Sequence, residues 1–304
     1  MDMRVNIAGV EWKNPVTVAS GTFGSGEEFS EFVDLNRLGA VTTKGVANVP
    51  WPGNPTPRVA EVYGGMMNAI GLQNPGIDKF ISDELPNLMS KNTVIIANIA
   101  GSTAEECAEI AAKLDNTDVH MIELNISCPN VRQGGMAFGA TCDGAASVTR
   151  LVRKATDKPL IVKLSPNVTS IADIAKSVEA EGADAVSLIN TLLGMRIDIN
   201  TRRPILRNNM GGMSGPAVLP VAVRMVWQTS GAVNIPVIGM GGISSGADAI
   251  EMMMAGASAV QIGAAIFTDP YAPVRIIEEI NEFLDSHGIS DIKDIIGAVS
   301  AWRE

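Results

Sequence analysis

The sequence predicts an α/β fold of the (β/α)8-barrel type. Short β-branched runs alternate along the chain with helix-length amphipathic segments, and there are eight such runs. Several runs are apolar throughout, as expected for parallel strands that are buried on both faces. The length of 304 residues suits such a barrel, so we expect residues 1–304 to form a single domain.

The expected strands lie at regular intervals along the chain. In order, they are Val16–Ser20, Ala40–Lys44, Val94–Ile99, Met121–Ser127, Leu160–Ser165, Ala185–Asn190, Val237–Met240 and Ala259–Gly263. A hairpin over Met3–Trp12, centred on Ala8-Gly9, is expected to close the barrel bottom. A doubly wound sheet is the rival fold, but the first strand runs into Ala19-Ser20-Gly21-Thr22-Phe23-Gly24, which lacks the Gly-x-Gly-x-x-Gly spacing of that fold.

Segments with helical periodicity fall between the strands. They are Thr103–Leu114, which follows a capping-box pattern at Ser102-x-x-Glu105, then Gly144–Ala155, Ile171–Glu181, Pro216–Thr229, Gly246–Ala255 and Tyr271–Ser286. Three connections are long: Gly45–Gly76, Cys128–Cys142 and Thr191–Gly215. Because each follows the C-terminal end of a strand, where barrel active sites lie, we expect them to be binding loops without a regular pattern.

Composition excludes several classes of protein. Hydrophobic residues make up 46% and charged residues 18%, which is typical of a globular chain, and the net charge of -10 argues against nucleic-acid binding. No apolar run approaches the ~20 residues of a membrane helix, and the N-terminus lacks a signal-peptide layout. Three cysteines and two distant histidines indicate neither a disulfide framework nor a metal site. We therefore expect the protein in the cytoplasm, which is the simplest assignment.

Glycine-rich segments follow the last strands. Gly239–Gly246 follows the seventh strand and Gly263-Ala264-Ala265 the eighth, while Gly211–Pro216, after the sixth, would complete the set. Glycines let a phosphate approach backbone N–H groups, and a following helix N-terminus adds a positive dipole. Tight turns alone are the simpler explanation. Two such loops together favour a phosphorylated ligand, without identifying it.

Two lysines, Lys44 and Lys163, lie in apolar strands. A charge in such a strand is costly without a partner. An internal ion pair is the structural explanation. The functional alternatives are a Schiff-base lysine of the aldolase kind, or a cation that stabilises a reduced flavin or a substrate carboxylate.

Amide side chains and one cysteine also lie at strand ends. The asparagines are Asn68, Asn98, Asn125, Asn130 and Asn190. Each taken alone is more typical of a turn, but together they suit a planar ring with C=O and N–H edges. Cys128 stands before Pro129, where the chain leaves the fourth strand. A free cysteine thiol has a pKa of about 8.5, so its thiolate is able to accept a proton near neutral pH. Cys107, on an apolar helix stripe, is expected to be inert.

Nearly the whole chain resembles the class 1 dihydroorotate dehydrogenases. The matching segments are Asn14–Val16, Ala19–Gly21, Gly53–Arg58, Asn68–Gly76, Asn125–Asn130, Val162–Pro166, Ile189–Thr191, Gly212–Gly215 and Gly239–Gly242. A cysteine base in Ser-Cys-Pro-Asn is similar to class 1, whereas the membrane-bound class 2 uses serine. Val131–Gly139 resembles the B type, in which the FMN subunit pairs with a chain that carries FAD and a 2Fe–2S cluster and passes electrons to NAD. The resemblance implies a homodimer joined by that chain into a heterotetramer.

The resemblance also implies roles for individual residues. Cys128 would remove the C5 proton of dihydroorotate while hydride passes from C6 to FMN. The residues implied at the cofactor are Ser20, Lys44, Gly45, Asn98, Asn125, Lys163, Ile189, Gly215, Gly241, Gly242, Gly263 and Ala264. Those implied at the substrate are Lys44, Asn68, Ala69, Ile70, Gly71, Leu72, Asn125, Asn190 and Thr191. The family carries Gly-Thr where this chain has Gly263-Ala264, so a contact there is expected from backbone N–H.

Four other functions stay open at this point. They are an A-type enzyme that acts alone with fumarate, an aldolase-class lyase that uses Lys163, a non-catalytic flavin-binding partner, and a flavoenzyme acting on uracil-like pyrimidines. Lys44 argues against the last, because uracil has no carboxylate to pair with that charge.

Overall fold

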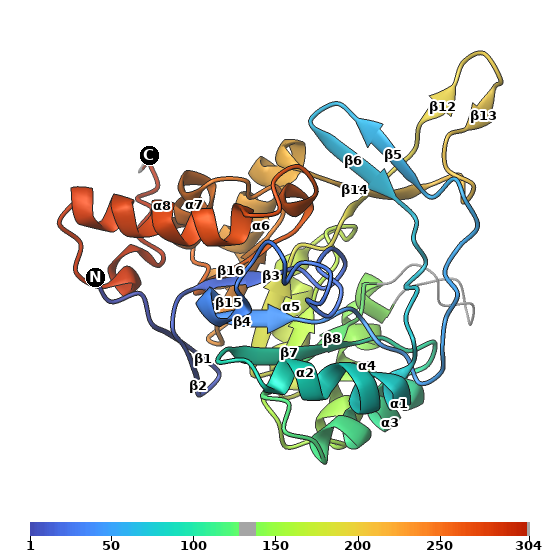
Figure 1. Ribbon diagram of the computed structural model, residues 1–304, viewed down its shortest axis with the longest axis horizontal. Helices are drawn as coiled ribbons and strands as arrows, with labels where there is room; N and C mark the ends of the chain where they lie inside the picture. The colour runs from blue at the N-terminus through green and yellow to red at the C-terminus, as the bar shows by residue number, and fades with distance from the viewer. Residues whose placement is uncertain (128–137, 303–304) are drawn as a thin grey trace.

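Eight parallel strands form the centre of the molecule in the computed structural model, which describes residues 1–127 and 138–302 (Figure 1). In spatial order they are β3 (Val16–Val18), β16 (Ala259–Ile262), β15 (Val237–Met240), β10 (Ala185–Leu188), β9 (Leu160–Lys163), β8 (Met121–Asn125), β7 (Val94–Ile99) and β4 (Ala40–Thr42). All eight predicted strands are confirmed. Six of them end one or two residues earlier than predicted, because the chain turns towards the barrel mouth there.

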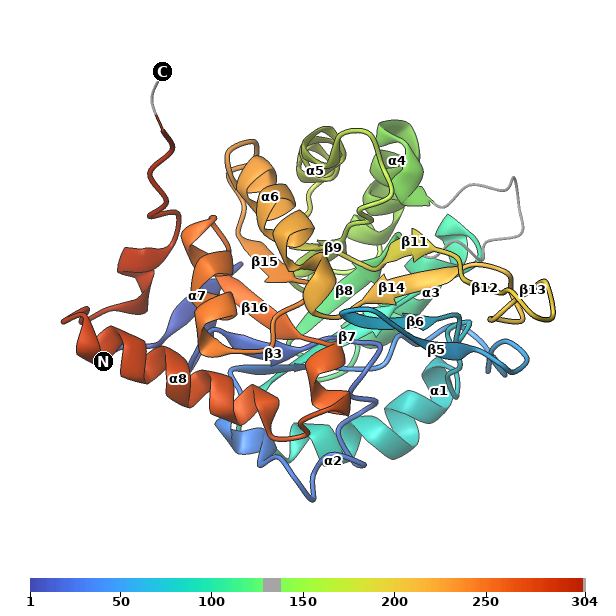
Figure 2. The ribbon, with the colours of Figure 1, turned by 90° about the horizontal axis from the view of Figure 1, so that it is seen from above.

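Helices surround this sheet on its outer side (Figure 2), which confirms the predicted barrel. They are α1 (Ile77–Lys79), α2 (Leu85–Met89), α3 (Ala104–Asp115), α4 (Cys142–Arg153), α5 (Ile171–Ala180), α6 (Leu219–Ser230), α7 (Gly246–Met254) and α8 (Ala272–Ser286). A π-helical turn over Phe80–Glu84 joins α1 to α2. Short 3-10 turns cover Leu35–Arg37, Phe138–Ala140, Pro216–Val218, Ala264–Phe267 and Ile292–Ile295. No helix in these described ranges is both long and apolar enough to cross a bilayer.

The predicted N-terminal hairpin is confirmed. Strands β1 (Val5–Ile7) and β2 (Val10–Trp12) pair antiparallel, and the side chains of Ile7 and Trp12 are fully buried in the main core. The barrel ring itself has a seam between β3 and β4, which form no ladder. A backbone hydrogen bond from Gly39 N to Val16 O (3.0 Å) spans this seam.

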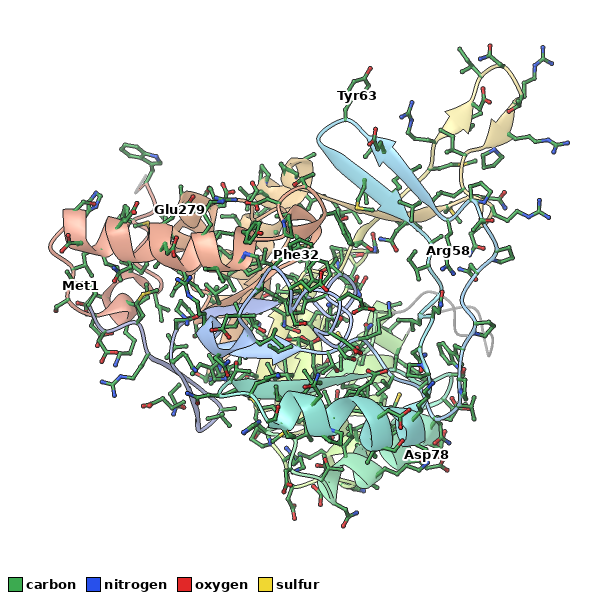
Figure 3. The ribbon with its side chains drawn as sticks, viewed as in Figure 1. Met1, Phe32, Arg58, Tyr63, Asp78 and Glu279 are labelled. Atoms are coloured by element: carbon green, nitrogen blue, oxygen red, sulfur yellow. The ribbon has the colours of Figure 1, made fainter. Side chains whose placement is uncertain are left out.

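A second sheet lies over the C-terminal ends of the barrel strands. It consists of β11 (Leu192–Gly194), β14 (Gly211–Ser214), β6 (Gly65–Asn68) and β5 (Val59–Val62), all antiparallel. The hairpin of β12 (Ile197–Asp198) and β13 (Arg203–Pro204) projects beyond it, as does Tyr63 at the β5–β6 turn (Figure 3). The expectation that residues 45–76 and 191–215 are irregular loops is therefore wrong.

Side-chain caps begin four of the eight α-helices named above, which are α3, α4, α5 and α7. Thr103 Oγ1 accepts a hydrogen bond from Glu106 N (3.1 Å), so it is the N-cap of α3. The predicted capping box at Ser102 and Glu105 is thus wrong by one residue, although Glu106 does accept from Ser102 N (2.6 Å). Each cap satisfies N–H groups that have no partner within the helix.

Candidate functional site

A cavity of about 530 Å³ opens between the C-terminal ends of the barrel strands and the second sheet. Its volume falls in the range of small-molecule sites, about 300–1,000 Å³. The end of β9 contributes Lys163, the segments just after β3 and β10 contribute Ser20 and Asn190, and the second sheet contributes Met66 and Met213. The site therefore lies between two layers that are distant in sequence, at the end of the barrel where ligands bind.

Two lysines converge on this cavity. Lys163 at the end of β9 is buried, and the Nζ atom donates to Ser20 Oγ at 3.3 Å. Lys44, just after β4, is partly buried. Burial lowers the pKa of both lysines, and the pKa of Lys44 is lowered further by Lys163 and Arg58. Neither lysine forms an ion pair with a described side chain, so the expected internal ion pair is not found in residues 1–127 and 138–302, and both cations suit an anionic ligand.

An amide network lines one wall. Asn125 Oδ1 accepts from Ser127 Oγ (2.7 Å) and Ser127 N (3.2 Å), and Asn190 Nδ2 donates to Ser127 Oγ. Asn190 Oδ1 in turn accepts from Thr191 N (2.7 Å). These bonds engage both ends of the Asn190 amide and the oxygen of Asn125, so they fix both side chains and hold Asn125 Nδ2 in a defined direction as a donor for a ligand.

Two glycine loops form another wall. Gly241 and Gly242 follow β15 with φ angles of +124° and +80°, a region that other residues rarely adopt. A Cβ at Gly242 would lie 2.6 Å from Leu219 N, and one at Gly241 would lie 2.9 Å from the Ala222 Cβ. The loop thus packs tightly on α6 and requires glycine at both positions.

The cavity brings together nearly all the site residues expected from the sequence. Those that line it are Ser20, Lys44, Asn125, Lys163, Ile189, Gly215, Gly241, Gly242, Gly263, Ala264, Asn68, Ala69, Ile70, Gly71, Leu72, Asn190 and Thr191. Gly45 and Asn98 do not line it but lie behind the Lys44 wall, where Asn98 Oδ1 is 2.6 Å from the Cβ position of Gly45. Cys128, Asn130 and residues 131–137 lie outside the described residues.

The sequence analysis missed a polar layer inside the barrel. Glu123 is fully buried, and its carboxylate accepts from Asn98 Nδ2 (2.5 Å), Ser187 Oγ (2.7 Å) and Gln261 Nε2 (2.8 Å). This charge also acts to raise the pKa of Lys163, against the larger effect of burial. The two lysines were identified because each is a charged residue in an apolar strand, and Glu123 in Met121–Asn125 meets the same criterion.

A second missed residue is Asn167, which lines the cavity after β9. Its Nδ2 atom donates to Thr191 O (3.0 Å) and its Oδ1 atom accepts from Leu193 N (2.9 Å). This side chain therefore fixes the segment that leads from β10 into the second sheet. No charge or motif marked it in the sequence.

Comparison with known proteins gives one consistent result. The family profile described as "Dihydroorotate dehydrogenase" matches residues 2–284. Three relatives carry the name "Dihydroorotate dehydrogenase B (NAD(+)), catalytic subunit". The one from Alkaliphilus metalliredigens is 58% identical over 98% of this chain and 99% of its own. Those from Lachnoclostridium phytofermentans and Geotalea uraniireducens are 57% and 55% identical, over 98% of this chain and 100% and 98% of their own.

Proposed function

The chain belongs to the dihydroorotate dehydrogenase family, and from that premise we propose that it oxidises dihydroorotate to orotate in pyrimidine synthesis, with NAD as the final acceptor. The observation that carries this proposal is the pair of lysines at the cavity. Two lysines at one cavity, neither of which forms an ion pair with a described side chain, suit a site that takes an anionic substrate beside an electron-rich ring. The lyase alternative receives no support from the relatives' names.

The residues at the cavity fit the flavin mononucleotide that this family uses. Gly241, Gly242 and Gly263 line the cavity, and among the described residues a Cβ at Gly263 would meet only the Ala19 Cβ, at 3.6 Å, so that backbone is open to a phosphate. Asn98 Oδ1 is a buried acceptor without a hydrogen-bond partner among the described residues, but it lies beside Gly45 outside the cavity lining, so it adds nothing to this fit. The loss of the family threonine at Ala264 is compatible with phosphate binding through backbone N–H groups.

Three groups of residues would bind FMN. Gly215, Gly241, Gly242, Gly263 and Ala264 would take the phosphate. Lys163 would place a positive charge at the ring edge, where reduced flavin is anionic, and Ser20, Lys44, Gly45, Asn98, Asn125 and Ile189 would surround the ring. When bound, the flavin supplies the hydride acceptor for substrate C6. The protein supplies orientation and charge.

A second set of residues, which shares Lys44 and Asn125 with the first, would bind the substrate. Lys44 would pair with the carboxylate of dihydroorotate, and the backbone of Asn68, Ala69, Ile70, Gly71 and Leu72 would hold the ring edge. Asn125, Asn190 and Thr191 would complete the site. Their mutual hydrogen bonds, described above, support this assignment because they fix the free donors and acceptors before the substrate arrives.

Cys128 is our proposed base for the C5 proton. It lies outside the described residues, directly after Ser127, which lines the cavity. A thiolate accepts a proton near neutral pH, and the Sγ atom would hold it after transfer. A serine in this place would need a stronger base beside it.

The proposed transfer of electrons from the reduced flavin to NAD requires a second protein chain. Because the relatives are named as catalytic subunits of NAD enzymes, we propose a second chain with FAD and a 2Fe–2S cluster, joined to a homodimer of this chain in a heterotetramer. The purified chain alone should then reduce its flavin with dihydroorotate but reduce NAD only after the partner is added. Rapid turnover of the isolated chain with fumarate would favour the A-type alternative.

The assignment of Cys128 is tested with a pair of cysteine variants. Cys128→Ala should keep the yellow flavin and lose about 10²–10⁴-fold in the rate of flavin reduction by dihydroorotate, which is what a general base contributes. Cys142→Ala, which removes an exposed thiol on α4, is the matched control and should react normally. Full activity of Cys128→Ala would refute the base assignment. A wild-type flavin that dihydroorotate never bleaches would refute the function itself.

A further inference from the structure

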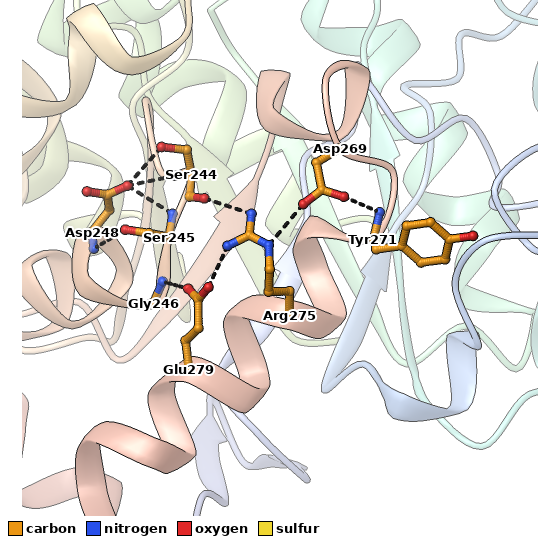
Figure 4. A network of polar contacts seen from close by, with 8 residues as sticks. All are labelled: Ser244, Ser245, Gly246, Asp248, Asp269, Tyr271, Arg275 and Glu279. Carbon is orange, nitrogen blue, oxygen red and sulfur yellow. Dashed lines mark hydrogen bonds and ion pairs between the residues drawn. The ribbon is translucent and has the colours of Figure 1, made fainter. Parts of the chain in front are cut away.

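One arginine on α8 connects the two loops that would hold the phosphate (Figure 4). Arg275 lies in the first turn of α8 and donates from three nitrogens in three directions. The Nε atom reaches Asp269 Oδ2 (2.9 Å) in the loop after β16, Nη2 reaches Ser244 O (3.1 Å) in the loop after β15, and Nη1 reaches Glu279 Oε1 (2.6 Å) one turn along α8. We call these four residues the arginine brace.

Each partner in the brace is itself fixed to one of the loops. Asp269 Oδ1 accepts from Tyr271 N (3.0 Å), and Glu279 Oε2 accepts from Gly246 N (2.5 Å), the first residue of α7. Ser244 N is held from the other side by Asp248 Oδ2 (2.9 Å). The carbonyl and the amide of Ser244 are therefore both engaged, and this residue stands two positions after Gly242.

The brace lies outside the cavity, since none of its residues lines it, whereas Gly242 and Gly263 on the same two loops do. A phosphate cradle needs N–H groups from both loops at fixed mutual positions. Packing on α6 holds Gly241 and Gly242 from one side, but it does not connect their loop to the loop after β16. Arg275 bonds to both loops and so fixes one relative to the other.

Charge gives the brace a second effect. Asp269 and Glu279 are two carboxylates on or beside the phosphate loops of a chain whose net charge is already -10. Arg275 offsets one of the two charges. The arginine is 38% exposed, so its ion pairs are partly screened and contribute little to global stability. Its effect is expected at the neighbouring anion site.

We propose that Arg275 is a positioning residue for the FMN phosphate, acting through the loops after β15 and β16 without touching the cofactor. This inference rests on the proposed function, which makes FMN the ligand of those loops. It predicts a selective effect: the brace matters for a ligand with a phosphate and not for one that lacks it.

The test compares FMN with riboflavin on flavin-free protein, using the quenching of flavin fluorescence to measure each dissociation constant. Arg275→Ala should weaken FMN binding about tenfold, because the two loops lose the side chain that fixes one relative to the other. Riboflavin binding should change less than about twofold. At saturating FMN, the KM for dihydroorotate should equal that of the wild type.

Arg37→Ala is the matched control. Arg37 also pairs with a glutamate of α8, Glu278 (2.8 Å), but bonds to neither phosphate loop, so its loss should leave both dissociation constants unchanged. Asp269→Asn keeps the shape of its side chain and should show a smaller, FMN-selective loss if Arg275→Ala fails to fold. Equal losses for FMN and riboflavin, or no loss of FMN affinity, would overturn the inference. Wild-type protein that binds neither flavin would instead overturn the proposed function, and this inference with it.

Discussion

Replacement of Glu123 by leucine is the sharpest test of the polar layer inside the barrel. Leucine fills similar space but removes the acceptor of three hydrogen bonds, from Asn98, Ser187 and Gln261, all fully buried. Each buried donor left without a partner costs about 1–3 kcal/mol. Since the Ser187 hydroxyl is free to rotate towards another acceptor, we expect the free energy of unfolding to fall by about 3–5 kcal/mol.

Glu123→Gln should behave differently. The new amide keeps one oxygen, and its nitrogen can donate to Gln261 Oε1, which is buried and has no partner in the described part of the chain, once the Gln261 amide turns over. We therefore expect a loss below about 1.5 kcal/mol, close to one ordinary hydrogen bond. The comparison separates the loss of an acceptor from the loss of a charge.

The assay is equilibrium unfolding of the flavin-free protein in urea, followed by far-ultraviolet circular dichroism, with the slope checked for constancy between variants. Thr149→Val is the matched control, because it removes one buried hydroxyl, which donates to Ala145 O (2.8 Å) within α4, and should cost about 1 kcal/mol or less. If Glu123→Leu proved no more destabilising than this control, the three contacts would not stabilise the barrel as argued.

Three further predictions follow from groups in and around the cavity. Burial and nearby cations hold the pKa of Lys44 below its usual range. Because the carboxylate of orotate pairs with the charged form of Lys44, the affinity for orotate should be full below that lowered pKa and should fall as the pH rises through it. The affinity of Lys44→Met for orotate, measured over the same pH range, should show no such fall. Burial raises the pKa of Cys107 to about 12. Iodoacetamide at neutral pH should therefore label exposed Cys142 and leave Cys107 unmodified until urea is added. Peptide mass spectrometry measures both labels, and equal labelling would contradict this prediction. Gly242→Ala should lower the unfolding free energy by about 1–3 kcal/mol in urea and also weaken FMN binding. Gly9→Ala, with a φ of +85° but open space around it, should show only the smaller backbone cost, and equal losses would remove the steric argument.

The barrel could be predicted because its strands are buried on both faces. Val94–Ile99 and Val237–Met240 were predicted to the residue, since both are short, buried runs in which at most one residue, Asn98, is polar. At the mouth the predicted strands ran too far. Lys44 and Ser20 continue an apolar run in sequence, but the chain has already left the ladder to face the cavity, and only the tertiary structure decides that point.

The second sheet could not be predicted from local pattern. Gly65–Asn68 and Gly211–Ser214 contain glycine and methionine but no β-branched alternation, and the two segments pair across almost 150 intervening residues. Their pairing is a property of the assembled barrel mouth. The two lysines, the glycine-rich segments, the strand-end asparagines and Cys128 stood out by physical argument, whereas the role of each residue came from the family resemblance.

The ladder between β3 and β16 has a consequence for how the protein is made. It joins residues 16–18 to residues 259–262, so the first barrel strand leaves the ribosome long before its hydrogen-bonded neighbour exists. At about 5–20 residues per second, the wait for the intervening stretch is roughly 12–50 s. During that time β3 has no ladder, because β4 does not pair with it. Ser20 and Gly263, which line the cavity just after these two neighbouring strands, are brought together only when synthesis is nearly complete, so this part of the cavity wall is not assembled before then.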